Sequence, residues 1–570
     1  MKKIYGFAFA AAVMALASCS NDNEPVNNPN PTPGEGELSY VAFNIATPAG
    51  TRADDFEEGK NFENAAEAAT FLFFNEDGTL SQIPQTVQLS WLENSATENP
   101  AVEKISNAIV AVAGRDNGNN LPTEVLVVLN DPGVNFVGKT KDEILKELAA
   151  ADQVYSLKYN GSAVSSLTKE QFGDDKNVEG KFIMTNSTYL ADGKVITATP
   201  IEESQLYSSR AAAAAAANKV NIFVERLAAR VNLVPKQGFD TTPTEAFQVN
   251  GVDSKIILKP VIKGVEIANV AQSEYYFKHI ESNWNLASLY DPANYRTNWA
   301  VMPENVELGN KSYNEYTTNL EDLTFYVTEN TLANEADSQI TKKTCVLLTA
   351  ELVNTETNKG QDLVRWAGLY FTPETFQTQG LNFLKKFYVK TVEDNTTAWR
   401  NLTADDVNFT YVSGNSDNGM AQYESALQVT LKDGVDAANL VVGNTEDAAA
   451  ATLDDLNAEL MQKENRCWYW NAGMTYYFVE IGSGNGTFVN GKNEAGEDIN
   501  DATFATGVVR NNAYQINLNS LAGLGVPVYN PDDKIIPQTP KEDLFYVGAQ
   551  INILKWRMVS QDADINQVPL

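Results

Sequence analysis

Short apolar runs that end in turn-forming residues recur along most of the chain. Residues 69–74 (Ala-Thr-Phe-Leu-Phe-Phe) run into Asn-Glu-Asp-Gly, and residues 125–129 run into Asn-Asp-Pro-Gly. Such runs predict β-strands that are closed by tight turns. The same pattern predicts further strands at 182–184, 220–224, 255–258, 325–327, 346–352, 363–371, 427–431 and 478–481. Many short strands joined by polar turns indicate antiparallel β-sandwiches.

Helical patterns are the minority. The clearest covers residues 141–150, where Thr140 and Glu143 have the spacing of a capping box and the apolar residues share one face. The alanine-rich run 211–217 fits a short helix and a loop equally well. We therefore expect a mainly β protein with a few short helices.

The first strand expected along the chain covers residues 38–47. Val41, Phe43 and Ile45 are apolar and alternate with other residues, which predicts a strand with one buried face. This strand directly follows a polar, proline-containing segment, 20–37, whose composition is that of an unfolded tether.

An exposed stretch, residues 47–55, follows this first strand and contains one basic residue, Arg52. A protease specific for arginine could cut between Arg52 and Ala53, because flexible exposed segments are the preferred sites of proteolysis. An ordinary loop arginine is the alternative.

The other end of the chain carries a second long alternating pattern. Its first apolar positions are Phe545, Val547, Ala549, Ile551 and Ile553, and its later ones are Leu554, Trp556 and Met558. The change of phase after Ile553 predicts a bulge or break that turns the chain over. Such a segment could bury one part in its own domain and offer the other to a neighbour, or it could simply complete its own sheet.

The first residues form a signal peptide, residues 1–18. Lys2 and Lys3 precede an apolar run of about 14 residues, which is shorter than the roughly 20 that a membrane-spanning helix needs. Small residues then lead to Cys19, so we expect cleavage and lipid attachment there, which would anchor the precursor in the outer membrane. An ordinary signal peptide followed by a chance cysteine is the alternative.

Composition narrows the classes of function. The 570 residues have a formal net charge of −32, which argues against binding to nucleic acid because the phosphate backbone would be repelled. Apart from Cys19, only Cys345 and Cys467 remain, and each lies in an apolar or aromatic setting. We expect two buried free thiols there rather than a disulfide.

Candidate catalytic and metal sites are scarce. The single histidine, His279, excludes multi-histidine metal sites, and no Cys-x-x-Cys, phosphate-binding loop or dinucleotide motif is present. The acidic stretch 498–501 lacks the spacing of an EF-hand loop and is typical of a solvated turn. Trp468 and Trp470 could stack on a sugar, but aromatic residues two apart in a strand are usually core. We expect no enzymatic activity, no cofactor and no metal.

Motifs near the C-terminus resemble those of one family. The segment 508–516 (Val-Val-Arg-Asn-Asn-Ala-Tyr-Gln-Ile), then Pro-Asp-Asp at 531–533 and a final strand ending at 553–556, resembles the Mfa-type fimbrillins, which are shaft pilins of type V fimbriae. Less specific similarity at 125–131, 224–231 and 325–331 extends the resemblance over nearly the whole chain.

This resemblance implies a fold, a mechanism and partners. It implies two antiparallel β-sandwich, transthyretin-like domains, at about residues 53–240 and 241–570, after a lipidated leader, 19–52. An arginine-specific protease would remove the leader with strand 38–47, and residues 544–570 of another copy would fill the vacated groove. Copies joined head to tail, with accessory tip and anchor pilins, would form an adhesive fimbrium on the cell surface. The main alternative is an outer-membrane surface lipoprotein that binds glycans.

Overall fold

The structure is a computed structural model, and it describes residues 39–48, 59–91, 102–112, 121–239, 245–280, 290–291, 295–297, 300–316, 320–331, 340–415, 417–481, 491–492, 498–499, 507–521, 523–538, 547–553 and 559–561. Strands predominate and the helices are short, so the mainly β expectation is confirmed. No helix in these ranges is long and apolar enough to cross a membrane.

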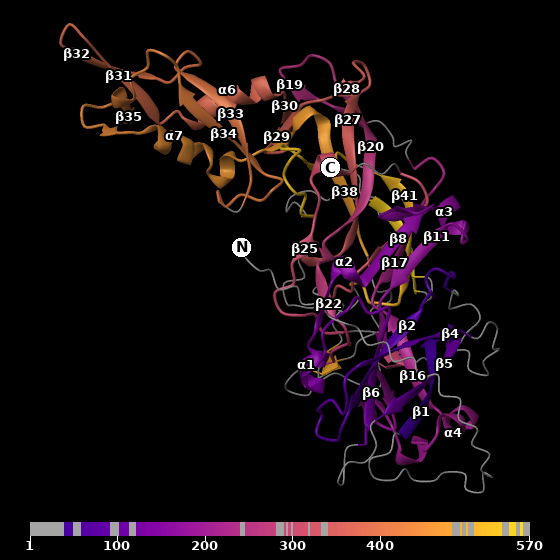
Figure 1. Cartoon of the computed structure of the whole chain (residues 1–570). Helices are drawn as coiled ribbons and strands as arrows, with labels where there is room; N and C mark the ends of the chain where they lie inside the picture. The colour runs from indigo at the N-terminus through magenta and orange to yellow at the C-terminus, as the bar shows by residue number, and fades with distance from the viewer. Residues whose placement is uncertain are drawn as a thin grey trace, which may run out of the picture.

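The first sheet forms the lower end of the molecule in Figure 1. Phe43 and Phe71 lie on strands that three other strands separate, yet their ring centroids are 5.0 Å apart. The Gln85 amide, at the edge of the sheet, also donates a 3.1 Å hydrogen bond to the carbonyl of Ala111 near the opposite edge. The sheet is therefore rolled around one core. Its strands, in order, are β3 (Gln85–Gln88), β2 (Ala68–Phe74), β6 (Glu124–Leu129), β12 (Met184–Asn186), β16 (Val220–Arg226), β1 (Ser39–Pro48), β5 (Val102–Val112) and β4 (Ser90–Trp91), with β15 (Thr199–Pro200) beside β6.

Two further sheets face one another in the second body. One has the order β10 (Ser166–Thr168), β26 (Leu323–Val327), β17 (Ala229–Pro235), β41 (Ala513–Leu521), β43 (Val547–Ile553) and β44 (Val559–Gln561). The other has the order β18 (Glu245–Phe247), β20 (Ile256–Ala268), β27 (Cys345–Asn354), β38 (Met474–Glu480) and β42 (Val526–Pro527), with β28 (Lys359–Gly360) beside β27. Buried side chains of both sheets, such as Val231 and Tyr514 from one and Leu348 and Tyr477 from the other, belong to one core.

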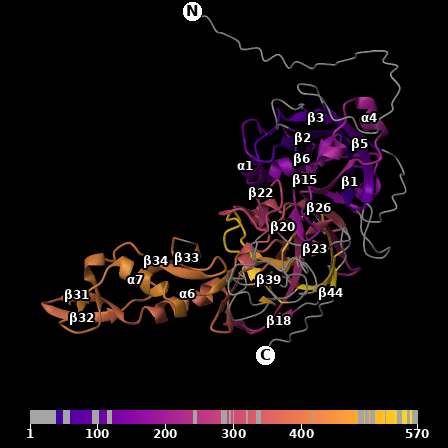
Figure 2. The same cartoon turned by 90° about the horizontal axis from the view of Figure 1, so that it is seen from below.

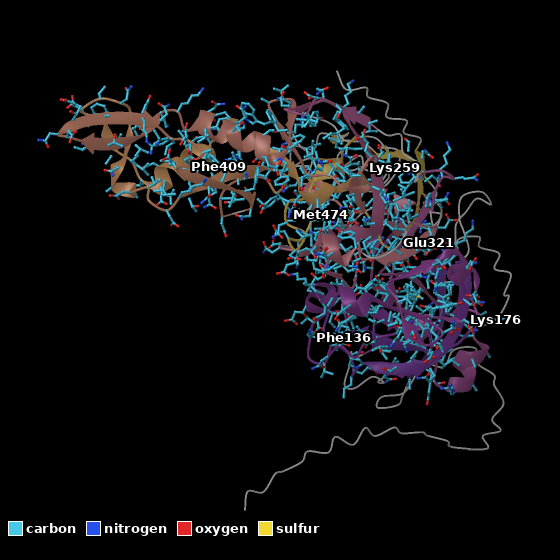
Figure 3. All side chains as sticks on the ribbon, turned by 90° about the horizontal axis from the view of Figure 1, so that it is seen from above. Phe136, Lys176, Lys259, Glu321, Phe409 and Met474 are labelled. Carbon is cyan, nitrogen blue, oxygen red and sulfur yellow. The ribbon has the colours of Figure 1, made fainter. Side chains whose placement is uncertain are left out.

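An arm, residues 363–470, lies between β28 and β38 in the sequence and extends sideways from the second body (Figures 1 and 2). Phe376, Leu427 and Leu456 are buried in a core of its own. Figure 3 labels Phe409 within this arm, well away from Phe136 in the first body. The elements of the arm and its root are β19 (Val249–Asn250), β29 (Leu363–Trp366), β30 (Leu369–Phe371), α6 (Pro373–Phe383), β31 (Phe387–Glu393), β32 (Thr396–Asn401), β33 (Val407–Ser413), β34 (Ser425–Leu431), β35 (Leu440–Val442), β36 (Ala449–Ala450), α7 (Leu453–Leu460) and β37 (Trp468–Trp470).

Buried charged residues join the first and second bodies where β16 leads into β17. Arg230 is paired with Glu63 at 3.0 Å with both side chains fully buried, and the Tyr326 hydroxyl donates to the same carboxylate at 2.6 Å. Arg510 is paired with Glu274 at 3.3 Å and with Glu329 at 3.1 Å. We call the whole set the junction cluster: Glu63, Glu225, Arg226, Arg230, Glu274, Lys278, Tyr326, Glu329 and Arg510.

Several predicted elements are confirmed and others are corrected. The capping box at Thr140 and Glu143 is present, but the helix that it begins, α1 (Lys141–Leu145), ends five residues early. Residues 148–150 form β7 instead, because they pair with β22 (Ser273–Tyr275) of a distant part of the chain. The single strand expected over 363–371 is two strands, β29 and β30, joined by a turn in which Ala367 and Gly368 both have positive φ, at 48° and 77°.

The alanine-rich run forms a helix, α4 (Arg210–Ala215), whose N-cap Ser209 accepts a hydrogen bond from the amide of Ala212 at 3.1 Å. The more specific expectation of two transthyretin-like domains, with a boundary near residue 240, stays a prediction. Other elements are α2 (Ala151–Val154), α3 (Lys169–Gly173), β8 (Tyr155–Tyr159), β9 (Ser162–Ala163), β11 (Val178–Phe182), β13 (Tyr189–Ala191), β14 (Lys194–Ile196), β21 (Val270–Ala271), β25 (Leu308–Gly309), β23 (Tyr290–Asp291), β24 (Arg296–Thr297), β39 (Gly491–Lys492) and β40 (Asp498–Ile499).

Candidate functional site

The first strand, β1, lies inside the first sheet and not at its edge. It runs antiparallel to β5 along its whole length and parallel to β16 over residues 43–46. Phe43 is the register point, because it lies opposite Ala108 of β5 and Val220 of β16. Removing β1 would therefore leave a strand-wide groove with unpaired backbone groups on both sides.

The inner face of β1 fills the core of the first body. Val41, Phe43 and Ile45 are each 0% exposed. The Phe43 ring packs against Phe71 and Phe73, with centroids 5.0 and 5.9 Å apart. Burial of such side chains contributes about 1.5–3 kcal/mol each, so this strand supports much of the core.

The outer face of β1 is covered as well. Ala42 is 2% exposed and packs with Tyr207 and with Ala213 of α4. The amide of Tyr40 donates to the carbonyl of Tyr207 at 2.7 Å, and the amide of Tyr207 donates back at 2.9 Å. We call Tyr207 together with α4 the cover. It was missed from the sequence because alanines carry little information about what they pack against.

Beyond the cover, the outer face is polar. The Asn44 amide donates to the Asn221 carboxamide oxygen of β16 at 2.9 Å. Position 42 therefore requires a small side chain, whereas position 44 accepts an amide that reaches across to the neighbouring strand.

The C-terminal strand, β43, has a different position, near the edge of its sheet. Residues 547–552 run antiparallel to 515–521 of β41, with Ile551 opposite Ile516 and Ala549 opposite Leu518. On its other side, residues 551–553 pair with β44, so the chain does turn back after Ile553. In this structure the terminal strand completes its own sheet.

Most of the predicted processing and donor residues cannot be placed. Val547, Ala549, Ile551 and Ile553 lie in β43. The remaining predicted sites lie outside the described residues: Cys19, Arg52, Ala53, Phe545, Leu554, Trp556 and Met558. Their roles stay predictions.

The sequence's candidates for chemistry have structural surroundings. His279 stacks on Tyr275 with centroids 4.0 Å apart and lies 2.6 Å from the carbonyl of Leu145, and burial lowers its pKa. Trp470 is 0% exposed, and the Arg365 guanidinium lies 4.8 Å from the Trp468 ring. Among the residues that the structure describes, no cluster of His, Cys, Asp or Glu could hold a metal ion.

The two remaining cysteines are both buried and free, as expected. Cys345 lies in β27 of the second body, whereas Cys467 lies in the core of the arm. Burial raises the pKa of both thiols, which keeps them protonated and unreactive.

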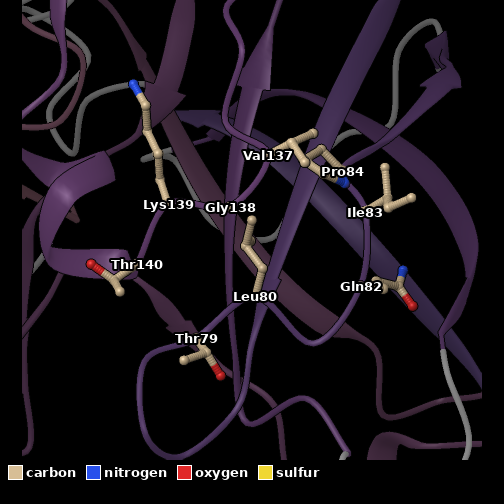
Figure 4. Close-up of a pocket in the computed structure, with 9 residues that line it drawn as sticks. All are labelled: Thr79, Leu80, Gln82, Ile83, Pro84, Val137, Gly138, Lys139 and Thr140. Atoms are coloured by element: carbon tan, nitrogen blue, oxygen red, sulfur yellow. The ribbon is translucent and has the colours of Figure 1, made fainter.

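A hollow of about 290 Å³ opens on the first body between the loops that flank β3 and α1 (Figure 4). Ile83 and Val137 border it and are 73% and 57% exposed. The Lys139 ammonium is paired with Glu147, and Thr140 caps α1, so the polar groups at its rim already have partners. The hollow therefore has little to offer a polar ligand.

The comparison with protein families decides between the classes that the sequence left open. Residues 469–562 match the family described as major fimbrial subunit protein type IV, fimbrillin, C-terminal. This chain carries the C-terminal region of a fimbrillin. The match confirms the resemblance indicated by the C-terminal motifs, and it indicates a structural fimbrial protein and not an enzyme. The fimbrillin region contains β37, β38, β41, β42, β43 and β44.

Solved structures that resemble the chain come from the same group of proteins. One, from Parabacteroides distasonis and described as a cell adhesion protein, is 12% identical, covers 93% of this chain and 99% of its own, and has a TM-score of 0.36. The tip fimbrial protein Mfa3 of Porphyromonas gingivalis is 10% identical with coverage of 85% and 96% and a TM-score of 0.28. The fimbrial anchor protein Mfa2 of Porphyromonas gingivalis is 11% identical with coverage of 56% and 79% and a TM-score of 0.21. The comparison with curated proteins found no similar sequence.

Proposed function

We propose that the protein is a shaft subunit of a cell-surface fimbrium and that it polymerises by strand replacement. The observation that carries this proposal is the position of β1, which is the first described strand of the chain and yet lies between β5 and β16 with its inner face fully buried. An early strand can leave a fold after one cut, because no later segment holds it covalently. The fimbrillin match at the other end supports the same assignment.

The order of events follows from the order of the segments. Lipidation at Cys19 would deliver the precursor to the outer membrane, and cleavage after Arg52 would detach β1, which ends four residues earlier at Pro48. Residues 544–570 of a second copy would then enter the groove. The groove supplies main-chain hydrogen bonds on both sides and pockets for alternate side chains, which is the chemistry of β-strand addition.

Repetition of this step gives a filament and not a closed ring, because each copy gives its C-terminal strand to one neighbour and receives one from another. The terminal copies would need partners that differ in one of these two roles. Tip and anchor pilins are such partners, and adhesion to other surfaces follows from display of the arm and bodies along the shaft.

Processing of the purified precursor with an arginine-specific protease tests the proposal. Wild-type protein should convert to a ladder of oligomers and to filaments visible by electron microscopy, whereas Arg52→Ala protein should stay full length and monomeric. Arg210→Ala is a matched control, because Arg210 is an exposed arginine outside the leader. Normal filaments from the Arg52→Ala protein would refute the mechanism.

A further inference from the structure

The beginning and the end of the chain contain similar strands. Residues 40–45 read Tyr-Val-Ala-Phe-Asn-Ile, and residues 546–551 read Tyr-Val-Gly-Ala-Gln-Ile. Tyr, Val and Ile recur in the same order and spacing, a small residue faces a small residue, and a carboxamide faces a carboxamide. Leu38 and Leu544 extend the correspondence by two positions towards the N-terminus.

We infer that the C-terminal strand of a second copy enters the groove in the direction of β1 and in one register, with Val547, Gly548 and Ile551 taking the positions of Val41, Ala42 and Ile45. This inference rests on the proposed function and goes beyond it by fixing which residue of the partner copy meets which residue of the groove.

The cover is what selects this register. Ala42 lies beneath Tyr207 and Ala213, and Ala213 is itself 0% exposed, so no room exists there for a longer side chain. When the apolar residues of the incoming strand face the core, its outward residues are Tyr546, Gly548, Gln550 and Asn552. Among these, Gly548 alone has no side chain. A slip of two residues would place Tyr546 or Gln550 beneath the cover.

A slip of one residue is excluded by the core. It would turn Gln550 inward, opposite Phe71 and Phe73, where an unpaired amide costs roughly 1–3 kcal/mol. In the inferred register the Gln550 amide instead takes the place of the Asn44 amide, which donates to Asn221 at 2.9 Å. The Tyr546 ring takes the place of Tyr40, which packs beside the cover.

One position does not correspond, and its consequence can be measured. Ala549 would stand where the Phe43 ring packs against Phe71 and Phe73, so the junction would lack that ring. At the other end of the strand, Ile553 would replace Thr47 and add apolar surface. The Ala549→Phe variant should therefore form filaments that dissociate more slowly in denaturant than wild type.

Cross-linking tests the register directly. Asn44 lies opposite Asn107 of β5, so Gln550 in its place would also lie opposite Asn107. Protein with Asn107→Cys and Gln550→Cys, cleaved and mildly oxidised, should give a disulfide-linked ladder under denaturing, non-reducing conditions. The native cysteines of the processed chain are buried and should not contribute. The matched control, Asn107→Cys with Asn552→Cys, should give no ladder, because the diagonal separation of roughly 7–8 Å is too long for a disulfide.

Two outcomes would overturn the inference in distinguishable ways. A ladder from the control pair and none from the first pair, with normal filaments in both, would refute the register and leave the proposed function standing. Failure of cleaved wild-type protein to polymerise would refute both.

The cover is tested separately by Gly548→Val. This variant should remain a folded, cleavable monomer but form filaments at least tenfold more slowly. Asn552→Val, which changes an outward position beyond the cover, should polymerise as wild type. Wild-type rates for Gly548→Val would show that the cover does not select the register.

Discussion

The two terminal strands, β1 and β43, are similar in sequence but occupy unlike places. β1 has a neighbour on each side and is covered on both faces, whereas β43 has one long neighbour, β41, and on its other side only the short β44. Detaching β43 breaks one main ladder, and detaching β1 breaks two ladders and opens a core. A donor strand that is cheap to release and a groove that is costly to leave empty together favour exchange between copies.

The two regions also share a support. β16, which borders the groove, ends in the junction-cluster residues Glu225 and Arg226, and β41, which holds β43, begins just after Arg510. The Arg226 guanidinium donates to the Asn511 side chain at 2.9 Å, so the two strands are linked directly. A change in the cluster should therefore be felt at both ends of the exchange.

The largest effect is expected from removing the donor. Deletion of residues 543–570 takes away β43 and β44 but leaves both cores, so the protein should fold, be cleaved and fail completely to extend filaments. Negative-stain microscopy and denaturing gels measure this. Deletion of residues 562–570 alone, beyond β44, is the control and should preserve assembly. Filaments from the longer truncation would mean that another segment fills the groove.

Next in size is the loss of the central cation of the junction cluster. Arg510 donates to Glu329 at 3.1 Å and to the carbonyls of Tyr275 and Tyr276 at 2.6 and 3.1 Å. Arg510→Met leaves buried carboxylates unpaired, which should lower the free energy of unfolding by about 3–5 kcal/mol. Urea denaturation gives the size, and hydrogen exchange in β16 and β41 gives the place. Protection lost in β41 alone would contradict a shared support.

Phe43→Ala separates the precursor from the filament. The change removes a fully buried ring and should destabilise the precursor by roughly 3–5 kcal/mol. Because β1 is discarded on cleavage, the finished filament should be as stable as wild type. Denaturation of the precursor and of assembled filaments measures both. Weaker filaments from this variant would show that β1 remains in them.

The pH should affect the junction cluster in one direction. Burial raises the pKa of Glu274 from 4.5 to about 8, more than the attraction of Arg510 lowers it, and burial likewise raises the pKa of Glu225. A carboxyl whose pKa is raised in the folded state binds more protons there than in the unfolded state. Its contribution to stability is full below about pH 4.5 and is lost as the pH rises towards 8.

Between pH 5 and pH 8 the stability of the precursor should therefore fall as pH rises, by up to about 1.4 kcal/mol per pH unit for each such group. Thermal unfolding across this range measures the slope. Glu274→Gln should flatten it, and Asp77→Asn, in an exposed turn, should not. A slope that is unchanged by Glu274→Gln would assign the dependence to other groups.

The strands with continuous apolar runs could be predicted from the sequence, because burial on both faces leaves a direct signature. β2 and β6 are examples, and almost every residue of each is buried. The capping box of α1 was equally readable, since its hydrogen bonds are local. The β7 strand was not, because its pairing with β22 joins segments far apart in the sequence and outweighs local helical preference.

The candidate site shows the same division. The alternation of Val41, Phe43 and Ile45 predicted a strand with one buried face, but its place inside the sheet depends on β5 and β16, which no local pattern specifies. The sequence also did not reveal the arm as a separate unit or the burial of Arg230 and Arg510. A charged pair such as Glu225 and Arg226 within an apolar run is a signal that buried ion pairs leave.

The smallest expected effect distinguishes the two occupants of the groove. Asn44→Ala removes an exposed hydrogen bond to Asn221 and should cost the precursor about 0.5–1.5 kcal/mol without changing the filament. Asn221→Ala should weaken both, because Asn221 stays in the groove and would accept a hydrogen bond from Gln550 after exchange. Denaturation of precursor and filament for the two variants gives four measurements. An Asn221→Ala change confined to the precursor would mean that Gln550 does not take the place of Asn44, and the correspondence between β1 and the incoming strand would then fail at its most exposed position.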